Sequence, residues 1–163
     1  KIDHLMGNSS GQKLALETEW NNKDEFYDRD FQNMRDLYDR HIIELGIIIT
    51  RGSSLDPKLE DMIQTYFENE GLSNFDDFDR IAKGFVDPDG SSRFTFPTDK
   101  QKREINKRVD SGHSFVKASA NVFKSQKFGT ATTNWKKLMA RIDRQNAGRC
   151  PMICLGIPAS IFD

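Results

Sequence analysis

The chain has 163 residues, of which 36% are hydrophobic and 30% are charged, a composition typical of a globular domain rather than of a disordered chain. Its apolar runs, such as Ile47 to Ile49, are too short to span a membrane. The formal net charge of −1 conceals a division, because residues 1–90 carry 10 Lys and Arg against 20 Asp and Glu, whereas residues 91–149 carry 14 against 4.

The first predicted elements are two strands. Residues 14–20 alternate with a period of two, which predicts a strand with Glu17 and Glu19 on the same face. Residues 2–5 predict a preceding strand, and the Gly- and Asn-containing residues 7–11 between them predict a hairpin loop.

Two helices and a strand are expected next. Apolar residues at helical spacing predict a helix over 28–43, and a short apolar run predicts a buried strand over 45–50. A second helix follows, with Asp56 as its N-cap, Pro57 in its first turn and Gly71 at its end.

The C-terminal half is harder to interpret. Residues 98–109 predict a basic helix, whereas residues 113–127 fit either a helix or a loop. Thr132 or Thr133 is the expected cap of a further helix through Ile142.

Residues 151–157 predict a final buried strand. The resulting alternation of strands and helices predicts an α/β fold, with a mixed central sheet flanked by helices.

Cys150 and Cys154 are the only cysteines. No histidine is near them in the sequence, so they are too few for a four-ligand zinc site. We expect two buried thiols on one face of a strand, and a reducing compartment.

Three carboxylates form the clearest chemical pattern. Glu17 and Glu19 are about 7 Å apart along one strand face, and pairing of the first two strands would bring Asp3 beside them. Such carboxylates repel and raise each other's pKa values, a cost that a hard divalent cation such as Mg²⁺ removes. Spacing alone also fits a solvated strand face that is acidic by chance.

Several stretches resemble a known enzyme family. Residues 17–24, 28–31 and 46–51 resemble the catalytic core of type II restriction endonucleases of the BamHI/BglII group, in the PD-(D/E)XK nuclease superfamily. Residues 128–138 resemble the C-terminal part of such enzymes. In that superfamily an Asp ends one strand and an acid-x-Lys triplet lies on the next, and this group replaces the Lys by Glu or Gln. Here Glu19 stands at that position, and the resemblance implies a restriction-endonuclease-like core.

The resemblance implies a catalytic set of Asp3, Glu17 and Glu19. Asp3 and Glu17, with the backbone carbonyl of Thr18, would hold one or two Mg²⁺ ions that polarise the phosphate and lower the pKa of the attacking water. Glu19 would act as a base or as a ligand of a second metal ion, and the sequence leaves both roles open.

The basic half then predicts contacts with DNA, because Lys and Arg neutralise phosphates while Thr, Asn and Gln read base edges. The candidate residues are Lys23, Lys124, Gln126, Lys127, Thr130, Thr132, Thr133, Asn134 and Lys136. Solvated helix faces and a capping turn are the alternative explanations. We expect the carboxylates to lie at the edge of the basic surface.

Together these features imply a Mg²⁺-dependent type II restriction endonuclease that hydrolyses double-stranded DNA at a specific, palindromic site. We expect a homodimer in a prokaryotic cytoplasm, accompanied by a DNA methyltransferase that is not a binding partner. Two alternatives stay open, namely a DNA-binding protein with an inactive nuclease core and a structure-selective repair nuclease.

The expected organisation is a single catalytic domain over residues 1–163. Residues 1–71 would form the catalytic core, 72–149 the basic DNA-contacting portion and 150–157 the final core strand. A chain that starts at Lys1, inside a motif, is typical of a segment that lacks an N-terminal part.

Overall fold

The computed structural model describes residues 2–82, 95–144 and 148–162. The chain divides into two compact units, the first formed by Lys1–Pro57 with Thr130–Asp163 and the second by Lys58–Gly129. The functional division expected at residues 71 and 149 is a different one and stays a prediction. None of the helices in the described ranges is long and apolar enough to cross a membrane.

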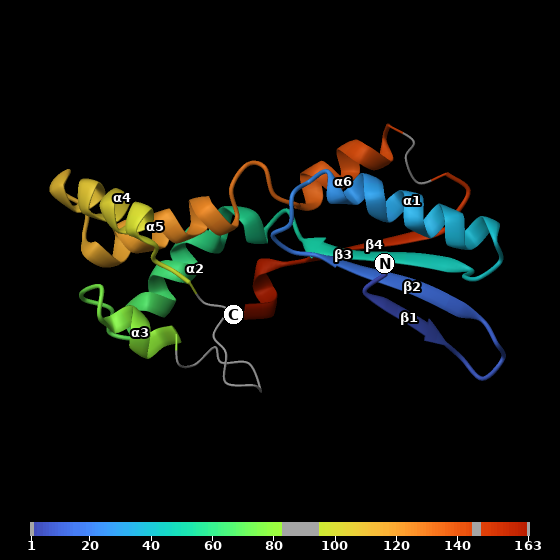
Figure 1. The fold of residues 1–163 in the computed structure, drawn as a ribbon, viewed down its shortest axis with the longest axis horizontal. Coiled ribbons are helices and arrows are strands. Elements are labelled where there is room, and N and C mark those ends of the chain that lie inside the picture. Colours follow the sequence, from blue (N-terminus) through green and yellow to red (C-terminus); the bar gives the residue numbers. More distant parts are fainter. Residues whose placement is uncertain (1, 83–94, 145–147, 163) are drawn as a thin grey trace. The chain divides into compact units, whose positions relative to one another are not determined.

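The first unit is built on a four-stranded sheet in the order β1-β2-β3-β4 (Figure 1). β1 (His4–Gly7) pairs antiparallel with β2 (Lys13–Glu19), which pairs parallel with β3 (Leu45–Arg51). β3 in turn pairs parallel with β4 (Met152–Ile157). The predicted α/β class with a mixed central sheet is confirmed, although the first strand starts after Asp3 rather than at residue 2.

Two helices, α1 (Phe26–Asp39) and α6 (Trp135–Ile142), cover one face of this sheet (Figure 1). Burial of apolar side chains between the helices and the strands is the main stabilising contribution to the unit. The buried cluster contains Ala15, Tyr27, Phe31, Met34, Ile43, Ile48, Leu138 and Cys150.

The last strand differs from its prediction. Although β4 was expected to be buried, the side chains of Ile153 and Leu155 are 43% and 47% exposed. Successive residues of a strand face opposite sides of the sheet, and α1 and α6 cover only one of these sides. Cys150 belongs to the buried cluster, and Cys154, on the covered side, packs against it; both are free thiols.

Helix α1 ends earlier than its apolar spacing predicts. Its last residue is Asp39 rather than Ile43, because His41 adopts a left-handed conformation with φ of 56°. The Ile42 amide donates to the Leu37 carbonyl and the His41 amide to the Tyr38 carbonyl, both at 2.9 Å. This is the Schellman arrangement, which usually places Gly at the left-handed position.

Helix α2 (Leu55–Asn69) ends by the same arrangement, and here the prediction is confirmed. Gly71 has a φ of +67°, and the Leu72 amide donates to the Phe67 carbonyl at 2.9 Å. The predicted N-cap is wrong, because Asp56 lies inside the first turn and forms an ion pair with Arg51.

The cap of α6 is also different from the expected one. Neither Thr132 nor Thr133 caps the helix, since Asn134 is the N-cap and its side chain accepts from the Lys137 amide at 3.1 Å. Within the first unit, Gly156 lets this helix approach β4 closely, because a Cβ there would lie 2.8 Å from the Trp135 ring.

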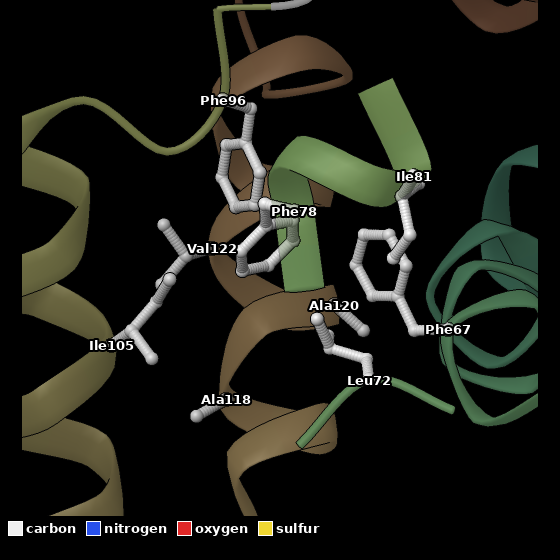
Figure 2. Packing of buried hydrophobic residues seen from close by; sticks show 9 residues of the cluster. All are labelled: Phe67, Leu72, Phe78, Ile81, Phe96, Ile105, Ala118, Ala120 and Val122. Atoms are coloured by element: carbon white, nitrogen blue, oxygen red, sulfur yellow. The ribbon is translucent and has the colours of Figure 1, made fainter. Parts of the chain in front are cut away.

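The second unit contains the remainder of α2 together with α3 (Asp77–Ala82), α4 (Asp99–Asp110) and α5 (Phe115–Lys127). Thr98 caps α4 where the basic helix was predicted, and the ambiguous residues 113–127 are largely helical. Figure 2 shows the core of this unit, whose buried side chains are Phe67, Leu72, Phe78, Ile81, Phe96, Ile105, Ala118, Ala120 and Val122. Edge-to-face aromatic pairs such as Phe78 with Phe96, 5.2 Å apart, stabilise it.

Candidate active site

The acidic side chains of β2 lie on its buried face. Glu17 and Glu19 are each 1% exposed and share that face with Ala15, whereas Thr18 between them is exposed. The alternative of a solvated acidic face is therefore wrong. Carboxylates are rarely buried to this extent without a partner of opposite charge, so their placement under the helices needs a chemical reason.

Asp3 lies directly beside Glu17. The Asp3 amide donates to Glu17 Oε2 at 3.4 Å, and the Thr18 amide donates to Asp3 Oδ2 at 3.2 Å. Pairing of β1 with β2, in which His4 lies opposite Leu16, produces this approach. The structure thus brings Asp3 and Glu17 together across the two strands, as the spacing predicted.

The structure adds a fourth carboxylate that the sequence reasoning did not assign. Asp30 of α1 is 0% exposed, and its Oδ1 accepts from Arg29 Nε at 2.8 Å and Nη2 at 2.7 Å. The same Nη2 atom lies 3.4 Å from Glu19 Oε1. One signal could have identified it, since Asp30 falls at helical spacing between Tyr27 and Met34, on the apolar side of α1.

Burial and crowding change the acidity of both glutamates. Desolvation, followed by the charges of Asp30 and Asp3, raises the pKa of Glu17 from 4.5 to about 7. Desolvation and a hydrogen bond with Asp30 raise the pKa of Glu19 from 4.5 to about 8. Both shifts indicate carboxyl groups that hold a proton more tightly than a solvated glutamate does.

Three carboxylate oxygens in this cluster are buried and accept no hydrogen bond, namely Glu17 Oε1, Glu19 Oε2 and Asp30 Oδ2. Oxygen donors of this kind are the ligands that Mg²⁺ prefers, so the chemistry of the cluster fits a divalent cation. In the part of the chain that the structure describes, no group of three or more His, Cys, Asp or Glu side chains is arranged around one metal position.

The segment before α6 is joined to the loop that follows β2. Lys23 and Thr132 form an antiparallel bridge, and the Thr133 amide donates to the Asn22 carbonyl at 2.9 Å. Arg51, which is 0% exposed, donates to Thr132 Oγ1 and to the Trp20 carbonyl, both at 2.9 Å. These contacts hold the predicted base-reading segment beside the end of the acidic strand.

The candidate DNA-contacting residues differ in accessibility. In the first unit, Lys23, Thr130 and Lys136 are exposed, while Thr132 and Asn134 are partly buried. Thr133 is 0% exposed, so its hydroxyl is not available at the surface. Lys124, Gln126 and Lys127 belong to α5 of the second unit, where Gln126 is exposed and the two lysines are partly buried.

Two basic residues of α6 form ion pairs with aspartates from the acidic N-terminal half of the sequence. Lys137 Nζ lies 2.9 Å from Asp24 Oδ2, and Arg141 pairs with Asp28 of α1. The basic residues of α6 thus belong to the same unit as the carboxylates. Part of their positive charge is therefore paired with carboxylates of the protein itself and is less available to a binding partner.

Comparison with known proteins adds one match. The family model for restriction endonuclease BglII/BglIII matches residues 1–157, which is nearly the whole chain. Searches of curated proteins and of solved structures found no match.

Proposed function

The chain belongs to the BglII/BglIII family of restriction endonucleases, which are site-specific DNA hydrolases, and from this premise we propose that its acidic cluster is the active site. The observation that supports this most directly is the set of buried carboxylates Glu17, Glu19 and Asp30, each of which has one buried oxygen that accepts no hydrogen bond. Buried carboxylates destabilise a fold unless they bind something, and a cation is the simplest partner.

Asp3 and Glu17 are the proposed cation ligands, together with the backbone carbonyl of Thr18. Glu17 Oε2 accepts from the Asp3 amide and Asp3 Oδ2 accepts from the Thr18 amide, so the two side chains are neighbours and a cation would offset the repulsion between their carboxylates. A Mg²⁺ ion bound there would polarise the scissile phosphate and lower the pKa of the attacking water.

Glu19 is the proposed base. Its raised pKa, to about 8, places its titration near the pH of the cell, which suits a group that accepts a proton from water. Its other possible role is that of a ligand of a second cation. Both roles need the carboxylate form.

We further propose that the enzyme cuts double-stranded DNA at a specific palindrome as a homodimer, in a prokaryotic cytoplasm beside a separate methyltransferase. A palindrome presents two equivalent strands, so two copies related by a two-fold axis place one active site on each. The exposed Lys23, Thr130 and Lys136 lie in the same unit as the acidic cluster, which supports their assignment to the DNA-contacting surface.

Plasmid digestion tests the proposal. The purified chain should produce discrete bands with Mg²⁺ and none with EDTA, and Glu17→Gln should abolish cleavage while DNA binding remains measurable by gel shift. Glu25→Gln is the matched control, since Glu25 is a surface residue whose side chain is 65% exposed.

The alternatives give different results in the same assay. DNA binding without cleavage by the wild-type chain would identify an inactive nuclease core. Preferential cleavage of branched DNA would identify a structure-selective nuclease. Full cleavage by Glu17→Gln would remove the acidic cluster from the mechanism.

A further inference from the structure

Thr50 and Arg51, adjacent residues at the end of β3, hold the end of the acidic strand. Thr50 Oγ1 donates to the Glu19 carbonyl at 2.7 Å, and Arg51 Nε donates to the Trp20 carbonyl at 2.9 Å. These carbonyls belong to Glu19 itself and to the residue that follows it. Because the Glu19 carboxylate is attached to this stretch of backbone, the two contacts fix the point from which it projects.

Arg51 also contacts the predicted base-reading segment, residues 130–134. Its Nη2 atom donates to Thr132 Oγ1 at 2.9 Å and to the Thr133 carbonyl. Its Nη1 atom forms an ion pair with Asp56, which anchors the guanidinium. The rigid fork of one planar group therefore joins the end of β2 to the base-reading segment.

Thr50 reaches the same segment through Tyr27. The Tyr27 hydroxyl lies 2.7 Å from Thr50 Oγ1 and donates to the Asn134 carbonyl at 3.2 Å. The side chains of Thr50, Arg51 and Tyr27 are each 0% exposed. None of them is available to DNA at the surface, so any effect that they have on DNA cleavage passes through the groups that they hold.

We propose that Thr50 and Arg51 are positioning residues that couple recognition of the DNA sequence to cleavage, by transferring a displacement of the base-reading segment to Glu19. This inference rests on the proposed function, in which Glu19 acts on the attacking water and residues 130–134 contact bases. A misplacement of about 1 Å at a catalytic group can lower a rate by a factor of about 100. A base-reading segment that shifts this far on an incorrect base pair would therefore slow cleavage even when the DNA stays bound.

Cleavage kinetics of the full chain with Mg²⁺ test the proposal through two variants. Thr50→Val keeps the shape of the side chain but removes the donor to the Glu19 carbonyl, and Arg51→Lys keeps the charge but not the fork. On the duplex that the wild type cleaves, each should lower kcat about tenfold or more and change KM by less than about threefold, because the lost contact acts on the chemical step.

The ratio of cleavage rates on correct and altered duplexes separates coupling from a structural defect. In the altered duplexes, each base pair of the cleaved site is changed in turn. Both variants should cut the correct duplex more slowly but altered ones at nearly the wild-type rate, so the ratio should fall about fivefold or more. A fraction of unfolded protein lowers both rates equally and leaves the ratio unchanged.

Ile43→Val is the matched control. Ile43 is 1% exposed and lies just before the opposite end of β3, so the variant loses buried apolar surface without touching these hydrogen bonds. It should keep the wild-type ratio of rates. An unchanged ratio for both Thr50→Val and Arg51→Lys, or an equal fall for Ile43→Val, would overturn the proposal while leaving the nuclease function intact.

Hydrogen exchange provides a readout that does not depend on cleavage. The Thr133 amide donates to the Asn22 carbonyl at 2.9 Å and the Asp24 amide to the Ala131 carbonyl at 3.0 Å, so their exchange reports how firmly the base-reading segment is held beside the end of β2. Both amides should exchange about tenfold faster or more in Arg51→Lys than in the control. Wild-type exchange in Arg51→Lys would overturn the proposal even if the chain cleaves DNA. Faster exchange in a chain that cleaves no DNA would keep the mechanical link and reject the proposed function.

Discussion

Asp3 and Glu17 approach each other across the β1–β2 pair, with the Asp3 amide donating to Glu17 Oε2 at 3.4 Å. A backbone donor of this kind offsets only part of the cost of burying a carboxylate that also faces Asp30. The remaining cost appears as a raised pKa, and it makes the stability of the cation-free protein depend on pH.

The first prediction concerns this pH dependence. Burial raises the pKa of Glu17 from 4.5 to about 7 and that of Glu19 from 4.5 to about 8, so the folded state binds more protons than the unfolded state above pH 4.5. The free energy of unfolding therefore falls as pH rises toward 8, on the order of 1–3 kcal/mol for each group. With EDTA present, the melting temperature should be lower at pH 8.5 than at pH 5.5.

Two controls accompany that measurement. Mn²⁺ or Mg²⁺ should raise the melting temperature more at pH 8.5 than at pH 5.5, because the carboxylates bind it in their ionised form. Glu17→Gln should flatten the pH dependence. A melting temperature that is constant or rises over this pH range would contradict the burial of these two groups.

The second prediction concerns Arg51. Its side chain is 0% exposed and contacts Asp56, the Trp20 carbonyl and Thr132 Oγ1. Arg51→Met fills the same space but leaves these acceptors and the Asp56 charge without their donor. We expect the free energy of unfolding to fall by about 3–5 kcal/mol in urea denaturation.

Arg40→Met is the matched control for Arg51→Met. Arg40 is exposed at the end of α1, and its replacement should change stability by about 0.5 kcal/mol or less. Similar losses for the two variants would show that burial of the Arg51 guanidinium is not what stabilises this region.

The helix ends show why sequence predicted part of the fold and not all of it. Gly71 identified the end of α2, because Gly is the residue that adopts a left-handed conformation without strain. The end of α1 uses the same hydrogen bonds with His41 in the left-handed position. A histidine does not by itself predict a left-handed residue at a helix end, so the apolar spacing predicts a helix that continues to Ile43.

The candidate active site shows the same division between local and tertiary information. Strand period and pairing were sufficient to place Asp3 near Glu17, and α1 itself was predicted. The sequence did not predict which face of β2 the helix would cover, since Leu14 and Leu16 are more apolar than Ala15 and Glu17. The covered face is the acidic one, and only tertiary structure reveals that Asp30 of α1 joins it.

A third prediction concerns the cap of α6. Asn134 accepts a hydrogen bond from the Lys137 amide, and its own carbonyl accepts from the Tyr27 hydroxyl at 3.2 Å. Asn134→Ala removes only the first of these, so it should cost about 1 kcal/mol, whereas Asn134→Asp should cost little. Thermal unfolding measures both, and an Asn134→Ala variant as stable as the wild type would contradict this assignment.

The last prediction compares neighbouring lysines of α6. Lys136 is exposed, whereas Lys137 lies 2.9 Å from Asp24 and also donates to the Thr130 carbonyl. If Lys136 contacts a phosphate, Lys136→Gln should weaken DNA binding and reduce the slope of log affinity against log salt by about 1. Lys137→Gln should instead destabilise the fold by about 0.5–1 kcal/mol, with a smaller change in the slope, because its charge is already paired. Fluorescence anisotropy at several salt concentrations measures the slopes, and an unchanged slope for Lys136→Gln would place the DNA elsewhere on the surface.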